Sequence, residues 1–504
     1  MAISDAQYQQ WLESDIFQNE YVDRTLLVEA KYYNAGEQTV YWSIGGYISG
    51  PLDTPANIEY EDSIKSFPSF SRSMSEAFTG KTRQSYGDIK IFNVNGEKDN
   101  LLTYAWNGRE IKLLLGDRSW SRDDFREILV GKIAEISSDS IDTLSLKIRD
   151  KGIVLDKQLT ETTFTTGPST NLLKPVCYGQ CYKIEPVLED HTTHKYRVHD
   201  GAVSTISTVY DQGVSISFTP NTSDGSFTLS AQPAGQITAD VEGATFVGLA
   251  GGAPAYYNTI AQIIYDIIVN RSDLSSSDID TTNLSSFNSS FTQTVGFYTS
   301  DKITLSSVLD KLVSSVGGYW GFNRTGKLTL GQLDDPSAGS SVLTIGSDDI
   351  LERGMSIKVR TLPYFKVTLG HTPYFRTQTT TELAGSVDEE AIVDLGQPYR
   401  LEIDEDVSIK TANLLAIESP VYETLLTNQE EAAGEAARRL GLLDSIRTIY
   451  FIDGFTSPFK INIGDIITID HNRFGFDGGQ KAVVVDFTES ITNSRSRIQL
   501  GVWK

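Results

Sequence analysis

Cysteine and histidine are scarce in this chain of 504 residues, which has two cysteines and five histidines. Two cysteines cannot build a disulfide scaffold, and they fit synthesis in a reducing cytoplasm. No apolar run approaches the roughly 20 residues of a membrane-spanning helix, since the best candidate, IAQIIYDIIV, is short and contains Asp266. The N-terminus MAISDAQYQQWLESDIF has neither a basic region nor an apolar core, so we expect no signal peptide.

Basic residues are in the minority, because 43 Lys and Arg stand against 66 Asp and Glu and the formal charge is −23. Nucleic-acid affinity comes largely from cations that neutralise phosphates, so the composition disfavours a DNA-binding role. A role beside DNA that avoids adhesion stays open, as does a charge that only keeps the protein soluble. Apolar residues make up 39% and aromatic residues 10%, which indicates a folded, loop-rich β protein.

Strand-like segments dominate the sequence. Six of them precede residue 151: TLLVEAKYY, TVYWSIGGYI, YGDIKIFNV, REIKLLLGD, EILVGKIAEI and TLSLKIRD. Short strands bounded by turns are typical of a barrel or sandwich. We expect a mainly β, multidomain fold with a small α/β module, in which two tandem related β-barrels flank inserted domains. The expected parts are a 1–29 N-terminal arm, a 30–158 first β-barrel, a 159–252 β-rich inserted domain, a 253–338 small α/β domain and a 339–504 second β-barrel with one helix.

A period of 3.6 residues marks two helices in the 253–338 module. One helical face carries Ile260, Ile263, Ile264, Ile267 and Ile268. A second apolar stripe runs from Leu305 to Val316, and it stops at Gly317. A hairpin that turns at 324–326 follows.

Three local signals predict turns and a third helix. Thr427 and Glu430 fit a capping box at the start of LTNQEEAAGEAARRLGLL. Asn-Gly pairs in NVNGEKDN and WNGRE are typical of tight hairpins. The stretch IDTTNLSSFNSSF, rich in Ser and Asn, is expected to be a loop.

Two distant hairpins resemble each other. Val130–Asp150 and Val483–Trp503 both span 21 residues, and each reads as a strand, a turn with Ser and acidic residues, and a strand alternating apolar with polar positions. A duplicated barrel around a middle insert explains the match. Two unrelated hairpins that look alike explain it as well, so both readings stay open.

One segment has metal-like spacing. Cys177 and Cys181 precede His191 and His194 in the pattern Cys-x3-Cys-x9-His-x2-His, with His199 further on. Zinc sites usually separate their histidines by about three to five residues, so the fit is imperfect. These four residues are weak candidates, and we predict no tightly bound metal because two thiols and loop histidines do not form a preorganised site. No motif of a hydrolase elbow, P-loop or zincin is present, and we expect neither catalytic residues nor a cofactor.

Three groups of segments carry a resemblance to a known family. They are RTLLVEAKYY with YWSIGGYIS, NGREIKLLLGD, LVGKIAEI and LKIRD; then KPVCYGQCYKIEPVLED with YRVHDG and VYDQGV; and finally IGDIITIDHNRFGFDGGQKAVVVDF with IQLGVW. In this order they resemble the tail-tip, or baseplate hub, proteins of long-tailed, siphophage-like bacteriophages. The resemblance implies a homotrimer that closes the hexameric tail tube with two barrels per chain. Some such proteins hold an iron–sulfur cluster, but Cys177 and Cys181 would supply only two ligands.

The resemblance also implies a role. The chain would be a structural virion protein of the tail tip, made in the host bacterial cytoplasm, and not an enzyme. Its partners would be distal tail or tail tube proteins, the tape measure protein and tip or fibre proteins. DNA would pass an acidic lumen during genome ejection without being bound. A carbohydrate-binding adhesin is the alternative, and a glycan hydrolase is a third class.

Overall fold

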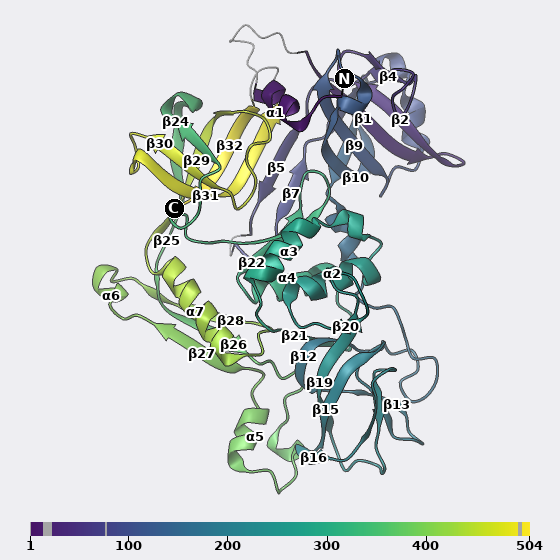
Figure 1. Ribbon diagram of the computed structural model, residues 1–504, viewed down its shortest axis with the longest axis vertical. Coiled ribbons are helices and arrows are strands. Elements are labelled where there is room, and N and C mark those ends of the chain that lie inside the picture. Colours follow the sequence, from purple (N-terminus) through teal and green to yellow (C-terminus); the bar gives the residue numbers. More distant parts are fainter. Residues whose placement is uncertain (1, 14–22, 76–77, 492–495) are drawn as a thin grey trace.

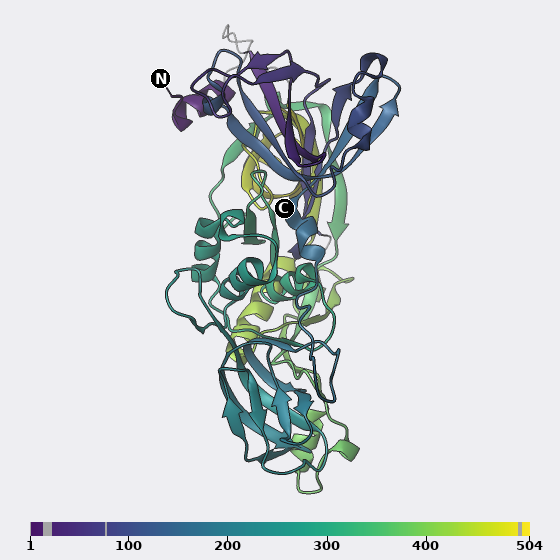
Figure 2. The same cartoon turned by 90° about the vertical axis from the view of Figure 1, so that its right-hand side faces the viewer.

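The computed structural model describes residues 2–13, 23–75, 78–491 and 496–504. The predicted arm residue Ile16 and the turn of the last hairpin lie outside these ranges. The fold is mainly β and multidomain, with several separate sheets (Figure 1). Two large sheets stand side by side at one end, a helical module lies in the middle, and two smaller β modules form the other end, as Figures 1 and 2 show.

The first large sheet contains all six strands expected before residue 151. Its order is β3 (Tyr47–Ile48), β4 (Glu59–Asp62), β2 (Glu37–Ser43), β1 (Arg24–Tyr33), β9 (Glu110–Asp117), β10 (Arg126–Ser140), β11 (Thr143–Arg149) and β8 (Ile89–Phe92). The sheet curls back on itself, because the Phe92 amide donates to Ser63 (2.8 Å) and the Lys65 amide donates to Lys90 (2.9 Å). Helix α1 (Asp5–Glu13) packs Tyr8 and Leu12 into its core.

The second large sheet is built mostly from the C-terminal part of the chain. Its order is β24 (Leu343–Gly346), β30 (Ile466–His471), β31 (Phe476–Ile491), β32 (Ser496–Trp503), β29 (Arg447–Thr456) and β25 (Ile350–Thr361), with β5 (Ser69–Ser73) and β7 (Arg83–Tyr86) added at β31. Alternate residues of β32 point into the core, and Trp503 is 1% exposed. The last strand is therefore a central part of this sheet.

The two large sheets follow the same order along the chain. In the second, β24 leads into β25, β25 pairs with β29, and the meander β30–β31–β32 returns to β29. In the first, β4 leads into residues 63–65, these pair with β8, and the meander β9–β10–β11 returns to β8. The hairpin β1–β2 is extra, and it stands between β4 and β9. This shared order supports a duplication.

The two matched hairpins share their pairing register. Each has an extra residue at the matched position, Ala134 in β10 and Val485 in β31, and β10 has a second one, Asp139, nearer the turn. The flanking pairs are Ile133–Ile148 and Glu135–Lys147 in one hairpin, and Val484–Val502 and Asp486–Gly501 in the other. When the two hairpins are aligned at these bulges, Lys132 corresponds to Val483. The sequence comparison of two 21-residue segments had instead matched Val130 with Val483. The offset arises because the connection after β31 is longer than the one after β10.

The remaining strands and helices form three smaller units. The first unit has two sheets that face each other across a shared core. One sheet contains β16 (Val214–Ile216), β15 (Val203–Asp211), β19 (Ile237–Phe246), β12 (Val176–Ile184) and β21 (Gly296–Thr299), with β20 (Ala255–Tyr256) paired to β19. The other sheet contains β13 (Val187–Asp190), β14 (Lys195–Arg197), β18 (Ser226–Thr228) and β17 (Thr219–Asn221). The middle module has α2 (Ile260–Arg271), α3 (Thr281–Ser290), α4 (Leu305–Ser314) and a sheet of β23 (Leu328–Gln332), β22 (Gly318–Phe322) and β6 (Gly80–Lys81). The last unit has β27 (Arg400–Glu405), β26 (Tyr364–His371), β28 (Ile417–Glu423), α5 (Glu389–Leu395), α6 (Ile409–Ala412) and α7 (Gln429–Leu443).

The predicted Asn-Gly hairpins are wrong. Residues around Asn95–Gly96 form two 3-10 turns, Val94–Gly96 and Asp99–Thr103, and β8 pairs with β11 instead of β9. The Asn93 side chain accepts the Lys98 amide (2.8 Å) and so stabilises this compact connection. Asn107–Gly108 immediately precedes β9, and β9 pairs with β1 and β10.

Two helix predictions also need correction. The stretch expected as a loop contains α3, because Asp280 accepts the Asn283 amide (3.0 Å) and Leu284 and Phe287 are buried. Helix α7 is capped by Asn428, whose side chain accepts the Glu430 amide (2.8 Å). Thr427 instead donates its hydroxyl to Thr294, so the capping box was wrongly assigned.

Some strands pack outside the expected spans. Strand β5 belongs to the 30–158 span, yet its residues pair with 486–490 of β31. The unit of β26–β28 and α7 lies in the 339–504 span, yet it shares a hydrophobic core with α2 and α4. The large sheets are thus joined to each other and to the middle module by chain segments that cross between them.

A substitution of Phe70 on β5 tests how much the junction of the two large sheets contributes to stability. Phe70 is 2% exposed and contacts the rings of Tyr86 and Phe459. We expect Phe70→Ala to lower the free energy of unfolding by about 3–5 kcal/mol, since it leaves a cavity in this contact. Thermal or urea denaturation measures the loss. Phe92→Ala is the matched control because Phe92 is 40% exposed, and an equal loss in both variants would contradict the prediction.

Candidate assembly surfaces

The predicted metal candidates lie in two different settings. Cys177 and Cys181 are buried on β12 in the core of the inserted β domain, whereas His191 and His194 lie in the turn between β13 and β14. Burial, and then the Cys177 thiol beside it, raise the pKa of the Cys181 thiol well above its ordinary value, which disfavours the thiolate that metals need. Within the described ranges, no three His, Cys, Asp or Glu side chains are arranged to hold a metal ion.

A buried polar network joins the inserted β domain to α2. Arg271, at the end of α2, donates two hydrogen bonds of 2.8 Å to Asp200. Its Nε donates to the Tyr178 hydroxyl (2.7 Å), and that hydroxyl bonds Asp266. Paired Arg–carboxylate contacts of this kind have a fixed geometry. The network therefore fixes the orientation of these two parts.

His199 completes this network in its neutral form. Its Nδ1 accepts the Cys177 amide (3.0 Å), so the ring proton belongs on Nε2, which lies 3.3 Å from Asp200. Burial lowers the pKa of His199 to about 4. His199, which follows the four metal candidates in the sequence, thus contacts Cys177 through a hydrogen bond from the Cys177 backbone amide.

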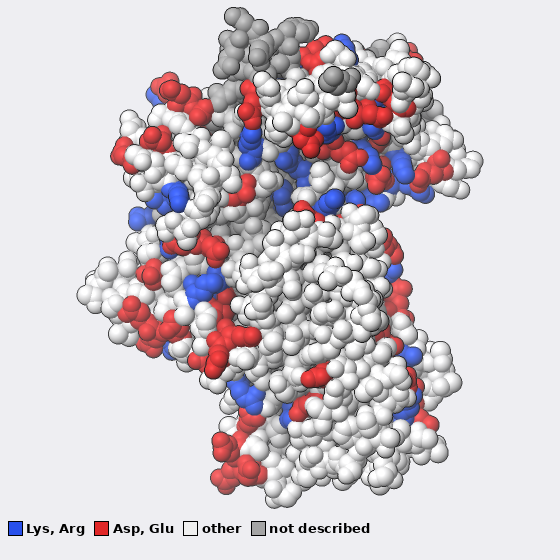
Figure 3. Space-filling view, viewed as in Figure 1, with Lys and Arg blue, Asp and Glu red and all other residues white. Residues whose placement is uncertain are grey.

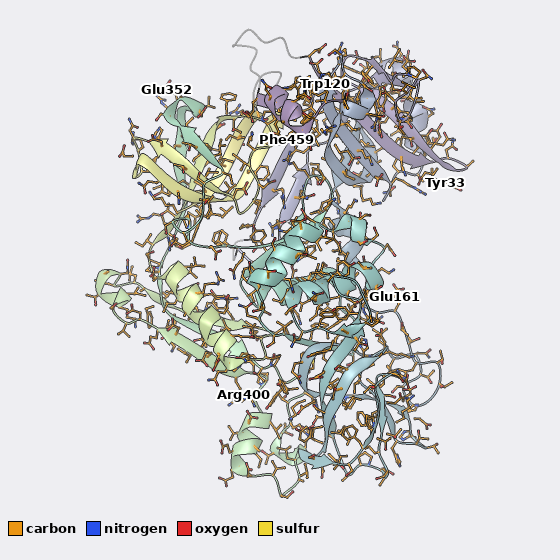
Figure 4. The ribbon with its side chains drawn as sticks, in the orientation of Figure 1. Tyr33, Trp120, Glu161, Glu352, Arg400 and Phe459 are labelled. Carbon is orange, nitrogen blue, oxygen red and sulfur yellow. The ribbon has the colours of Figure 1, made fainter. Side chains whose placement is uncertain are left out.

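Residues 382–431 carry much of the net charge. This segment holds 13 Asp and Glu and 2 Lys and Arg, so its formal charge is −11 of the chain's −23. It forms the unit of α5, α6 and β27 and part of α7, and Figure 3 shows acidic side chains along this edge. Arg400, labelled in Figure 4 between β27 and α5, is one of the two cations and pairs with Asp394 (2.8 Å). Long-range repulsion is concentrated here.

The same unit exposes apolar side chains. Phe365, Val367 and Leu369 of β26 face α7 and are buried. The opposite face of the sheet is exposed, and it carries Leu401 (52%), Ile403 (49%) and Val421 (43%). Ile403 and Val421 flank Thr368 of the middle strand, so they lie on the same surface. We call Leu401, Ile403 and Val421 the apolar face; exposed apolar side chains gathered on one face are typical of an interface.

Sequence reasoning missed the apolar face. RLEIDE alternates apolar with charged residues, which is the pattern of a half-buried strand with Leu401 and Ile403 inside. In the structure the pattern is inverted, because Glu402 lies opposite the buried Leu369 and faces α7. Leu414 and Leu415, 88% and 73% exposed beside β28, were a further signal.

A second surface has no charge. Residues 243–265 and 281–300 contain no Asp, Glu, Lys or Arg. They include α3 and the first half of α2, and Figure 3 shows a broad uncharged area over the helical module and the sheet below it. A surface without charged side chains has little to desolvate when it is covered, so it is a second candidate contact.

His199 gives a prediction for pH dependence. Its pKa is lower in the folded chain than the ordinary value near 6.5, so its contribution to stability is present above pH 6.5 and is lost as the pH falls toward 4. We expect His199→Asn, which keeps an acceptor near the Cys177 amide, to reduce the fall in melting temperature between pH 7 and pH 4.5. The exposed His191→Asn is the control. An unchanged pH profile in His199→Asn would contradict the assignment.

Within the described ranges, no helix is both long and apolar enough to cross a membrane. No protein-family model matches the chain, and no curated protein does.

Several solved structures are similar to it. The tail protein of Neisseria meningitidis MC58 is 10% identical with a TM-score of 0.38, and the match covers 96% of this chain and 97% of that one. The prophage tail protein gp18 of Listeria monocytogenes EGD-e is 9% identical with a TM-score of 0.37, over 95% and 94%. A chain of the native gene transfer agent virion is 14% identical with a TM-score of 0.43, over 70% and 91%. At these values the similarities assign no role to any residue.

Proposed function

We propose that the chain is a structural hub protein of a bacteriophage tail tip. It closes the tail tube as a homotrimer and leaves a lumen through which DNA passes. The observation that carries the proposal is the repeated strand order of the two large sheets, joined by the ladder between β5 and β31. The resemblance of the N- and C-terminal strand segments to tail-tip proteins supports the same role.

The repeat suits a change of symmetry. Three chains with two related sheets each present six similar positions, which match a hexameric tube on one side, while the inserted units differ and keep threefold symmetry on the other. The hairpin β1–β2 distinguishes the two sheets within a chain. Neighbouring distal tail, tube, tape measure and tip or fibre proteins would contact the two sides. The chain would act mechanically and not as an enzyme.

A carbohydrate-binding adhesin is the second candidate, since exposed aromatic side chains such as Tyr33 (47% exposed) can stack on sugars. Tyr33 lies at the tip of β1 in Figure 4. An adhesin would bind glycan as a single chain. A hub would assemble whether or not glycan is present, so mass and glycan binding together separate the two.

The apolar face is proposed to contact the next copy in the ring. Light scattering after size exclusion should give a mass of three times 55.6 kDa. The double variant Leu401→Ser and Ile403→Ser should dissociate toward single chains, because the interface loses its apolar contact, and should keep its melting temperature.

Two residues outside the face provide a matched control. Leu52 and Ile141 are 94% and 86% exposed in connections of the first large sheet. Leu52→Ser with Ile141→Ser should remain a trimer. A trimer that survives the Leu401 and Ile403 changes would exclude this face as the contact between copies, and a wild-type monomer that binds glycan would exclude the hub.

The acidic segment is proposed to face the lumen. Screening limits exposed charges to about 8 Å at physiological salt, so only carboxylates at the lumen wall can repel a passing duplex. We expect Glu389 and Glu390 of α5, both exposed, to lie on the inward side of the ring. A cryo-electron microscopy reconstruction of the assembled protein locates them. A neutral or positive lumen wall would remove the electrostatic support for DNA passage.

A further inference from the structure

A polar cavity lies where the two large sheets meet the middle module. It has a volume of about 610 Å³, and residues from α1, β5, β10, the β22–β23 hairpin and the 459–465 connection line it. Phe459, labelled in Figure 4, lies beside α1 at this junction. Figure 3 shows Lys and Arg side chains gathered in the recess between the upper sheets and the middle module. The cavity is thus at the point where the relative position of the sheets is set.

Arg72 brings a buried charge to the cavity wall. It stands on β5, is 5% exposed, and burial lowers the pKa of its guanidinium. Its side chain makes no hydrogen bond or ion pair with any described residue, and its buried Nε lacks a partner there. Buried guanidinium groups are normally paired, because an unpaired buried charge is costly.

Arg324 is the second cation of the cavity. It lies in the turn of the β22–β23 hairpin, which the Val130 amide anchors by donating to its carbonyl (2.8 Å). Its guanidinium lies over the Phe459 ring, 4.2 Å from the centroid, and donates to the Phe459 carbonyl (3.1 Å). Burial lowers the pKa of Arg324, the carboxylate of Glu489 opposes this decrease, and the like charge of Arg72 adds to it. Among the described carboxylates none forms an ion pair with it.

The carboxylates near the cavity do not neutralise these two arginines directly. The four that line it have other partners: Asp5 pairs with Arg126, Glu127 pairs with Lys112, Asp280 accepts the Asn283 amide and Asp465 accepts the Asn462 amide. Behind Phe459, Glu489 accepts the Phe459 amide (2.8 Å). Burial raises the pKa of both Asp465 and Glu489; Arg324 opposes this increase at both carboxyls, and Arg72 opposes it at Asp465.

We propose that Arg72 and Arg324 bind an oxyanion, a carboxylate or a phosphate group, in the cavity between the two sheets. Guanidinium groups recognise both classes through two parallel hydrogen bonds. An anion there would supply the missing acceptors of Arg72 and reduce the repulsion between the two cations. It would also tie β5 to the β22–β23 hairpin, and so connect the second sheet with the middle module.

The full-length protein tests the site with two probes, inorganic phosphate and citrate. Calorimetric titration and melting curves compare each with sodium chloride at equal ionic strength. We expect one or both probes to bind and to raise the melting temperature. A response to phosphate alone assigns the phosphate class, and a response to citrate alone assigns the carboxylate class; each supports the site. No stabilisation beyond that by chloride would overturn it.

Two variants separate the site from a general structural role. Arg72→Met should melt at the same or a higher temperature than wild type without anion, because it removes an unpaired buried charge, and should lose the stabilisation by anion. Arg324→Gln should weaken anion binding by at least about tenfold. The exposed Arg360→Gln is the control. Anion stabilisation of wild-type size in Arg72→Met or Arg324→Gln would refute the proposal, and either variant suffices if the other does not fold.

Discussion

Backbone hydrogen bonds between β5 and β31 hold the two large sheets together. Strand β5 leaves the first sheet after residue 65 and pairs with residues 486–490 of the other end of the chain, before β8 returns to the first sheet. Because a ladder of backbone bonds fixes both distance and register, the two sheets cannot rotate freely against each other. The cavity with Arg72, the contacts of Phe70 and Phe459, and the placement of the middle module all follow from this crossing.

The distribution of charge and apolar surface follows a second constraint. The acidic unit of β26–β28 and α7 shares its core with the middle module, so one face of its small sheet is already used. The other face keeps Leu401 and Ile403 in contact with solvent in the single chain. The carboxylates around these apolar side chains would repel one another if two copies met through the same face. In the proposed ring, a contact with a different surface of the next copy would avoid this repulsion.

Much of the fold could be predicted from sequence. The strand segments before residue 151, the isoleucine stripe of α2 and the hairpin at 324–326 have strong local patterns, and the structure confirms them, although TVYWSIGGYI is divided into β2 and β3. Helix α4 ends at Ser314, three residues before the predicted stop at Gly317. The predictions for the α3 segment and for the cap of α7 were wrong because Ser and Asn side chains stabilise turns and helix ends alike. Only the contacts of Leu284 and Phe287, made with distant residues, decide for the helix.

The sequence alone determined a mainly β architecture, the scarcity of metal ligands, the acidic balance and the likeness of two hairpins, because each depends on residue type or short-range spacing. Tertiary structure decided which hairpin residues correspond, since the bulges at Ala134 and Val485 set the register. It also decided that β5 crosses to the second sheet, that Leu401 and Ile403 face outward, and that Arg72 is buried without an ion pair among the described residues. These features depend on which segment covers a given face, and that is settled only when residues far apart in the chain meet.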